Sequence, residues 1–236
     1  MKIFGIIPAR LNSTRLPKKA LIKIKDKTLI QRVYENIKYS DKIKHLVIAT
    51  NDKEIEKNVK SFGGDVVYTK ENHTNGTERC REAVKKLKIQ DDDIVLNIQC
   101  DEPMMDKEAI DLIYSAFKDN PKLNIVTLAS SKITEDELHN QSVVKVVLDE
   151  NFFATKFCRK IKNTNALKHI GIYAYKKKVL VELAKLKPTR LEKIEKLEQL
   201  RWTGNNYQIK CVVTKKNYIS INTKEDLNTY KKNYIL

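Results

Sequence analysis

Apolar runs alternate with helical patterns along this chain, and that alternation constrains the fold more than any other feature. A strand followed by a helix repeats through the first 130 residues, which predicts an α/β fold with a mostly parallel central sheet flanked by helices. The runs with strand character are 2–8, 44–50, 65–68, 93–98, 123–129, 143–148, 152–157, 169–175 and 207–213. The helical patterns are 28–39, 52–62, 76–88, 107–118, 176–186, 190–201 and 223–233.

The length of 236 residues suits one large domain, and no Pro/Gly-rich linker divides it. The second half mixes shorter strands with helices, as in a small lid or dimerisation extension of the same domain. Ligands of parallel sheets bind outside the carboxyl ends of the strands. That rule selects three loops as the candidate site, 8–19, 69–77 and 99–104.

The first of these loops carries several cations and hydroxyls directly after an apolar strand that stops at Pro8. Its cations and hydroxyl residues are Arg10, Ser13, Thr14, Arg15, Lys18 and Lys19. Cations and hydroxyls are the groups that hold phosphate oxygens, so the loop is a candidate triphosphate site. The chain has neither GxxxxGK[ST] nor GxGxxG, so side chains rather than bare backbone would hold the anion. The alternative is an ordinary basic surface loop.

The other two loops offer a metal ligand and a second anion contact. Asp101 follows a strand and faces the cationic loop, which suits Mg²⁺ held against phosphate oxygens, and Gln99 can contact a base or sugar edge. The alternative is that Asp101 and Glu102 cap the helix that begins near residue 106. The segment 72–79 leads into a helix whose free N–H groups, together with Arg79, suit a phosphate or a nucleobase, and Asn75 is expected to cap that helix.

The net charge of +16 admits two interpretations. Lysines occur from end to end, often beside acids, which indicates a lysine-biased composition with a field that favours anionic substrates. A nucleic-acid binder is the weaker alternative, and RNA binding with a steep salt dependence would reveal it.

No apolar run approaches the ~20 residues of a membrane span, and no signal region precedes the first strand, so we expect a cytoplasmic protein without a membrane partner. Cys80, Cys100, Cys158 and Cys211 have no metal-site spacing and are expected as free thiols.

The second half supplies polar residues but no catalytic triad. Arg159 ends a strand, His169 begins one with alternating aromatic residues, and 197–201 closes a helix. No Ser or Cys partner for His169 can be argued, so nucleophilic catalysis by the protein is not expected. Chemistry by positioning, cations and metal fits the pattern better.

Taken in order, these motifs resemble the CMP-Kdo synthetases, the 3-deoxy-manno-octulosonate cytidylyltransferases. The matching segments cover nearly the whole chain, whereas the first loop alone would indicate only a cytidylyltransferase. They are 7–10, 13–17 with Lys19, 76–79, Gln99 with 101–103, 144–149, 169–173, 191–192, 197–201 and 223–227.

The resemblance implies a Rossmann-like nucleotide-diphospho-sugar transferase fold and the reaction of CTP with Kdo to give CMP-Kdo and pyrophosphate. It also implies a homodimer, Mg²⁺ as cofactor, a nucleotide-binding part near 1–130 and a sugar-acid and dimerisation part near 131–215. By motif, Arg10, Ser13, Arg15 and Lys19 would hold the triphosphate, Arg79 and Gln99 the nucleotide, and Asp101 the metal, with Arg10, Lys19 and Asp101 as the catalytic set. The sugar-acid pocket would comprise Arg159, His169, Tyr173, Glu198 and Gln199.

The sequence departs from the family pattern at three places. Asn222 stands where the family has a second metal carboxylate, and Cys100 stands where it has a glycine. The stretch between Arg159 and His169 is shorter than usual. These departures leave two alternatives open: a paralogue that activates another acidic sugar, such as an amino-substituted Kdo, and an impaired paralogue that binds CTP but releases no pyrophosphate.

Overall fold

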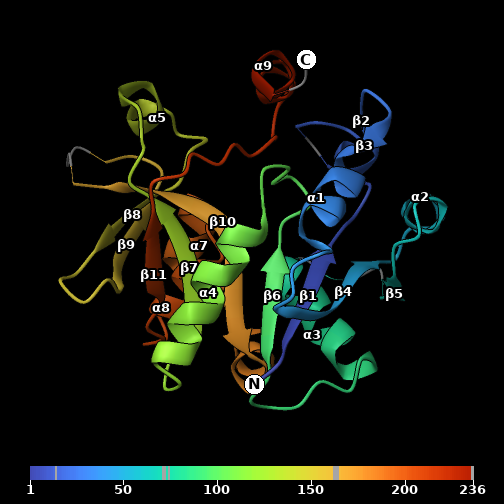
Figure 1. Ribbon diagram of the computed structural model, residues 1–236. Helices are drawn as coiled ribbons and strands as arrows, with labels where there is room; N and C mark the ends of the chain where they lie inside the picture. The colour runs from blue at the N-terminus through green and yellow to red at the C-terminus, as the bar shows by residue number, and fades with distance from the viewer. Residues whose placement is uncertain (14, 71–72, 74, 162–164, 235–236) are drawn as a thin grey trace.

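The computed structural model describes residues 1–13, 15–70, 73, 75–161 and 165–234. Within these residues nine strands form one twisted sheet, and its main path runs β11-β7-β10-β6-β1-β4-β5 (Figure 1). The strands of that path are β1(Ile3–Pro8), β4(Ile43–Thr50), β5(Val66–Tyr68), β6(Ile94–Ile98), β7(Ile125–Ser130), β10(Leu167–Lys176) and β11(Lys210–Thr214). All neighbours on the path are parallel except β10, which runs antiparallel between β6 and β7. The hairpin of β8(Lys145–Leu148) and β9(Ala154–Cys158) pairs with the start of β10.

Helices cover both faces of the sheet, as the alternating pattern predicted. On one face lie α1(Leu29–Ile37), α2(Lys53–Ser61) and α4(Lys107–Asp119), whose buried side chains join Ile7, Leu96 and Val126 in one core cluster. On the other lie α3(Gly76–Lys86), α6(Lys177–Leu183) and α8(Gln199–Thr203), packed with Ile6, Val95 and Tyr175. The expected mostly parallel, helix-flanked α/β sheet is therefore confirmed.

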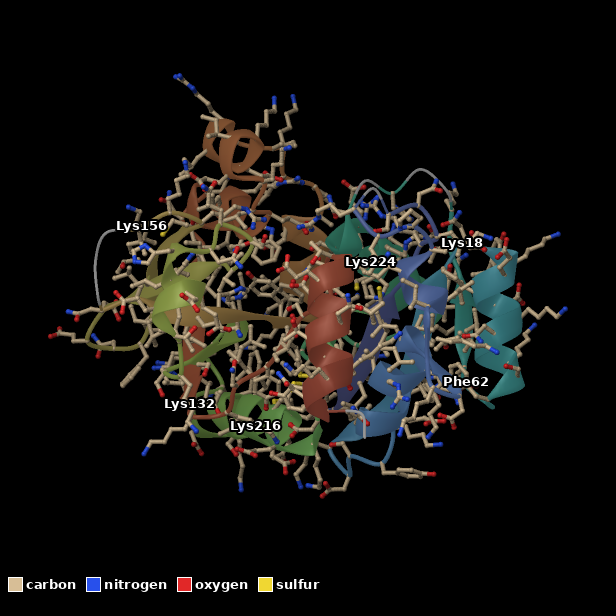
Figure 2. All side chains as sticks on the ribbon, turned by 90° about the horizontal axis from the view of Figure 1, so that it is seen from above. Lys18, Phe62, Lys132, Lys156, Lys216 and Lys224 are labelled. Carbon is tan, nitrogen blue, oxygen red and sulfur yellow. The ribbon has the colours of Figure 1, made fainter. Side chains whose placement is uncertain are left out.

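The last helix crosses the carboxyl edge of the sheet. α9(Lys224–Tyr234) buries Leu227 and Tyr230 in a small cluster with Leu16 and Leu29. Seen from above, it lies between the half that carries Lys18 and the half that carries Lys132 and Lys156 (Figure 2). The C-terminal segment thereby reaches the loops that were selected as the candidate site.

One expected helix is wrong, and some short elements were not expected. The helix over 190–201 is two helices, α7(Arg190–Glu195) and α8, because Lys196 takes a left-handed conformation with φ 54°. This turn lets Leu197 and Leu200 enter the core, whereas α7 buries none of its residues. The elements without a predicted counterpart are η1(Lys19–Leu21), β2(Lys23–Ile24), β3(Lys27–Thr28) and α5(Glu135–His139).

Candidate active site

The three loops selected from the sequence converge on one cavity of about 620 Å³ at the carboxyl edge of the sheet. The loop after β1, the start of α3 and the loop after β6 form its walls, and Asn222 reaches it from the C-terminal segment. The lining residues are Pro8, Ala9, Arg10, Asn12, Ser13, Arg15, Lys19, Ala20, His73, Asn75, Gly76, Arg79, Gln99, Cys100, Asp101 and Asn222. Thr14, Asn72 and Thr74 lie outside the described residues.

The loop after β1 and the start of α3 lie close together because a glycine, Gly76, stands where they meet. A Cβ on Gly76 would lie 3.3 Å from Pro8 Cγ, so the N-terminus of α3 approaches the end of β1 more closely than a larger residue would comfortably permit. Asn75 caps α3 by accepting from the Glu78 N–H at 2.8 Å. The helix N-terminus therefore opens directly onto the cavity, as anion binding would need.

Lys19 joins two of the loops to the C-terminal segment. Its Nζ lies 2.5 Å from Asp101 Oδ2 and 3.2 Å from Asn222 Oδ1. Arg15 Nη2 donates to the same Asn222 oxygen at 3.2 Å. The neighbouring Lys18 is exposed and instead pairs with Glu54 of α2 at 2.8 Å. Of the two adjacent lysines, only Lys19 therefore belongs to the cavity.

The donor set suits a hard cation that takes most of its ligands from substrate. Asp101 Oδ2 and Asn222 Oδ1 both accept from Lys19 Nζ, so a divalent cation held by these two oxygens would take the place of the ammonium. Among the described residues no group of three His, Cys, Asp or Glu side chains forms a metal cluster. Mg²⁺ tolerates few protein ligands when phosphates and water complete its shell. The alternative role for Asp101, capping the next helix, is wrong: Asp106 caps α4 by accepting from the Ala109 N–H at 3.1 Å.

Arg79 and Gln99 line the cavity and are held by hydrogen bonds to other protein groups. Arg79 is buried and donates to Thr69 Oγ1 at 2.5 Å and to the Lys70 carbonyl at 3.4 Å. Burial and the nearby Arg10 lower the pKa of its guanidinium. Gln99 Nε2 donates to Asn97 Oδ1 at 3.2 Å. Both side chains are thus fixed by protein partners before any ligand binds.

His73 and Asn12 also line the cavity, although no role was assigned to either from the sequence. His73 Nε2 lies 2.6 Å from Glu82 Oε2. Burial alone would raise the pKa of Glu82, but the Lys70 N–H, His73 and Lys86 hold it at about 2. The position of His73 in the turn before α3 was the available signal, because that turn was already a candidate loop.

A second cavity of about 330 Å³ adjoins the first, and Arg15 and Asn222 line both. Of the residues predicted for the sugar-acid pocket, Arg159 and His169 line it. The full lining is Arg15, Glu102, Glu137, Asn140, Ser142, Val143, Val144, Arg159, Lys168, His169, Gly171, Ile219, Ser220, Asn222, Asp226 and Thr229. Two substrates could therefore meet at the shared wall.

His169 is held as a neutral imidazole. Burial lowers its pKa to about 3, and its Nε2 lies 3.0 Å from Thr127 Oγ1. The same hydroxyl donates to the Ile172 carbonyl at 2.7 Å, which leaves its oxygen to accept from His169 Nε2–H. This tautomer leaves Nδ1 as an acceptor, so His169 can receive a hydrogen bond but offers no positive charge.

Tyr173, Glu198 and Gln199 line neither of these two cavities. Tyr173 packs edge-on against Trp202 at 4.9 Å between ring centroids, on the face of the sheet that holds α3 and α8. Glu198 directly precedes α8, and burial raises the pKa of its carboxyl to about 7. All three are outside the lining of these cavities, and their assignment to the sugar-acid pocket stays a prediction.

Four ionisable residues of the second cavity were not assigned a site role from the sequence: Glu102, Glu137, Lys168 and Asp226. Glu102 is buried, accepts from the Ser220 hydroxyl, and packs so closely that a Cβ on Gly171 would lie 2.8 Å from its Oε1. Burial and the adjacent Asp101 raise the pKa of Glu102 to about 7. Lys168 bonds to Glu137 at 2.6 Å and to Asn217 at 2.9 Å. For Glu102 and Lys168, the positions beside Asp101 and His169 were the only sequence signals.

A family model described as Cytidylyltransferase matches residues 4–215. The 3-deoxy-manno-octulosonate cytidylyltransferase of Fusobacterium nucleatum is 42% identical over 234 residues, which cover 96% of this chain and 94% of the relative. The chain belongs to the 3-deoxy-manno-octulosonate cytidylyltransferase family.

Other members of the cytidylyltransferase family agree with this assignment. An 8-amino-3,8-dideoxy-manno-octulosonate cytidylyltransferase of Shewanella sp. is 35% identical, with 97% of this chain and 96% of the relative covered. A solved CMP:2-keto-3-deoxy-manno-octonic acid synthetase complexed with CTP superposes with a TM-score of 0.90 at 32% identity and 98% coverage of both chains. The resemblance stated from the sequence motifs is therefore confirmed.

Proposed function

We propose that this protein is a cytidylyltransferase that joins CMP from CTP to the anomeric hydroxyl of Kdo or a close analogue and releases pyrophosphate. The observation that carries the proposal is the shared wall of Arg15 and Asn222 between two polar cavities. A triphosphate in the larger cavity and an acidic sugar in the smaller would meet there. Holding two reactants in this way lowers the entropy cost of their reaction.

In the proposed reaction the anomeric oxygen forms a bond to the α-phosphorus, the bond to the β-phosphate bridging oxygen breaks, and the hydroxyl proton passes to solvent or base. Arg10, Ser13, Arg15 and Lys19 would bind the triphosphate, with Arg10 and Lys19 stabilising the charge that grows on the departing pyrophosphate. Arg79 and Gln99 would hold the nucleotide. These roles rest on the positions of the residues around one cavity.

We propose Mg²⁺ as the cofactor, bound by Asp101 and, through its amide oxygen, by Asn222. When bound it would neutralise charge on the phosphate oxygens. Asn222 supplies an oxygen but no charge, so binding would depend on phosphate oxygens from the nucleotide. The support is the convergence of Asp101 Oδ2 and Asn222 Oδ1 on Lys19.

The acceptor is proposed as Kdo, with 8-amino-Kdo as the second candidate because relatives at 35% identity carry that name. Arg159, His169, Tyr173, Glu198 and Gln199 remain the proposed sugar-acid residues. We also propose a cytoplasmic homodimer that binds no nucleic acid. The described helices include none long and apolar enough to cross a membrane.

Pyrophosphate release tests the proposal. The full chain would be incubated with CTP and one sugar at a time, with and without Mg²⁺. The sugars are Kdo, 8-amino-Kdo and a neutral ketose. Release with one acidic sugar and Mg²⁺, and none with the ketose, is expected. CTP binding without release for any sugar would instead identify the impaired paralogue.

A further inference from the structure

Lys145 begins β8, and its side chain is completely buried. Its Nζ donates to the carbonyl oxygens of Asn140 at 2.6 Å and Arg159 at 2.8 Å. In the described part of the chain no acid forms an ion pair with it, and Glu137, whose charge reaches it, bonds to Lys168. Burial lowers the pKa of the Lys145 ammonium. Carbonyl dipoles, rather than a counter-ion, hold this positive charge.

Such a charge is unfavourable for folding alone. Burying an ammonium without a paired acid loses its hydration, and apolar residues of similar volume often replace buried charges at no cost in stability. The residue opposite Lys145 on β9 is the buried Cys158, so an uncharged side chain at position 145 would meet an uncharged neighbour there. Lys145 therefore calls for a role beyond packing.

The two carbonyls that Lys145 binds belong to the wall of the second cavity, because Asn140 and Arg159 both line it. Arg159 in turn donates from Nη1 to the Gln141 carbonyl at 3.0 Å and from Nε to the Glu195 carbonyl at 2.9 Å. Lys145 thus holds the backbone from which Arg159 projects, and Arg159 holds the loop that Lys145 also binds. The two cations form one clasp around residues 140–142.

The clasp carries two positive charges, and within the described residues the hydrogen-bond acceptors of Lys145 and Arg159 are carbonyl oxygens. Lys168, on the same cavity, differs because Glu137 neutralises it at 2.6 Å. Burial and the nearby Arg15 lower the pKa of Arg159, and the charge of Glu195 offsets part of that effect. Glu102, Glu137 and Asp226 also line the cavity, with Glu137 paired to Lys168. The wall formed by Arg15, Arg159 and the buried Lys145 nevertheless carries a local excess of positive charge, which would attract a carboxylate ligand.

We propose that Lys145 is a positioning residue for the acidic sugar: it fixes Arg159 in the cavity wall and adds a buried positive charge, so that the cavity selects a carboxylate. This inference rests on the proposed function. It assigns the preference for an acid to a side chain that does not itself line the cavity.

The test compares the full chain with Lys145→Gln, Lys145→Met and the control Lys177→Met. Gln keeps a hydrogen-bond donor without the charge, and Met removes both. Lys177 is a lysine at the opposite end of the sheet, paired with Asp91 at 2.5 Å. Calorimetry would measure binding of Kdo and of its methyl ester with Mg²⁺ and α,β-methylene-CTP, which cannot release pyrophosphate.

Wild-type protein and Lys177→Met are expected to bind the acid at least about tenfold more tightly than the ester, as charge complementarity predicts. Lys145→Met should weaken binding of the acid about tenfold and leave the affinities for the ester and the nucleotide unchanged. The affinity of Lys145→Gln for the acid should lie between those of wild-type protein and Lys145→Met. An unchanged acid preference in Lys145→Gln, or equal losses for acid and ester, would overturn the inference. If Lys145→Met does not fold, Lys145→Gln decides.

Pyrophosphate release by the wild-type protein with CTP and Kdo separates the two proposals. Release without a preference for acid over ester would leave the function standing and overturn the role of Lys145. The opposite outcome is also distinguishable. If the wild-type protein releases no pyrophosphate but prefers the acid over the ester, and Lys145→Gln abolishes that preference, the role of Lys145 stands and the proposed function is overturned.

Discussion

Lys19 and Asp101 lie 82 residues apart in the chain, and an ion pair of 2.5 Å joins Nζ of the first to Oδ2 of the second. Their side chains are only 14% and 19% exposed, so solvent screens the pair weakly. The ammonium stands between Asp101 and Asn222, whose oxygens are the proposed metal ligands. The pair therefore connects the proposed phosphate-binding loop to the proposed metal site.

Lys19→Ala is expected to reduce kcat/KM for CTP by on the order of 10²-fold, because it removes a charged contact to the phosphates. Lys18→Ala is the matched control, since Lys18 is its exposed neighbour and pairs with Glu54 outside the cavity. Steady-state kinetics with CTP varied would measure both, and Arg10→Ala should behave like Lys19→Ala. Equal kinetics for the Lys18 and Lys19 variants would mean that the triphosphate does not bind this loop.

CTP is expected to stabilise the protein against heat more than ATP or GTP does, because the proposed base is cytosine. A ligand at about 100 times its Kd adds about 2.7 kcal/mol to the free energy of unfolding. Thermal melts with each nucleotide at one concentration would show the difference. Equal shifts for the pyrimidine and purine nucleotides would contradict the cytidylyl specificity.

The parallel part of the fold could be predicted because its signal is local. Strands such as β1 and β6 are buried on both faces and appear in the sequence as short continuous apolar runs, each followed by an amphipathic helix. The antiparallel insertion of β10 between β6 and β7 has no such signal, because strand order depends on contacts between distant segments. The break at Lys196 was missed because a lysine with positive φ has no sequence signature.

The candidate site was predictable to the extent that the fold rule selected its loops. Arg10, Gln99 and Asp101 follow parallel strands, so their meeting at one edge follows from topology. Which of Lys18 and Lys19 faces inward depends on the left-handed backbone at Lys18, where φ is 51°. The hydrogen bonds from Lys145 to two loop carbonyls could not be predicted from the sequence either, because lysine side chains are usually exposed and this one is buried.

Glu198 gives a pH-dependent prediction. Burial raises the pKa of its carboxyl from 4.5 to about 7, so the folded state binds this proton more tightly than the unfolded state. The stabilisation is fully present below pH 4.5 and is lost as pH rises through about 7. Urea unfolding from pH 4.5 to 8 should show this decline in wild-type protein and a flatter profile in Glu198→Gln. Parallel profiles would mean that Glu198 does not titrate in this range.

Asn222→Asp tests the proposed metal site, because Asn222 Oδ1 shares Lys19 Nζ with Asp101 at 3.2 Å and 2.5 Å. A carboxylate at position 222 adds a second charged oxygen ligand to a site whose one carboxylate is that of Asp101, and Mg²⁺ prefers such ligands. The Mg²⁺ concentration for half-maximal pyrophosphate release should therefore fall, and Mn²⁺ binding followed by electron paramagnetic resonance with CTP present should tighten. Asn217→Asp is the matched control, since it adds the same charge beside Lys168 rather than beside Asp101. Superimposable Mg²⁺ and Mn²⁺ curves for Asn222→Asp and wild-type protein would show that residue 222 does not touch the metal.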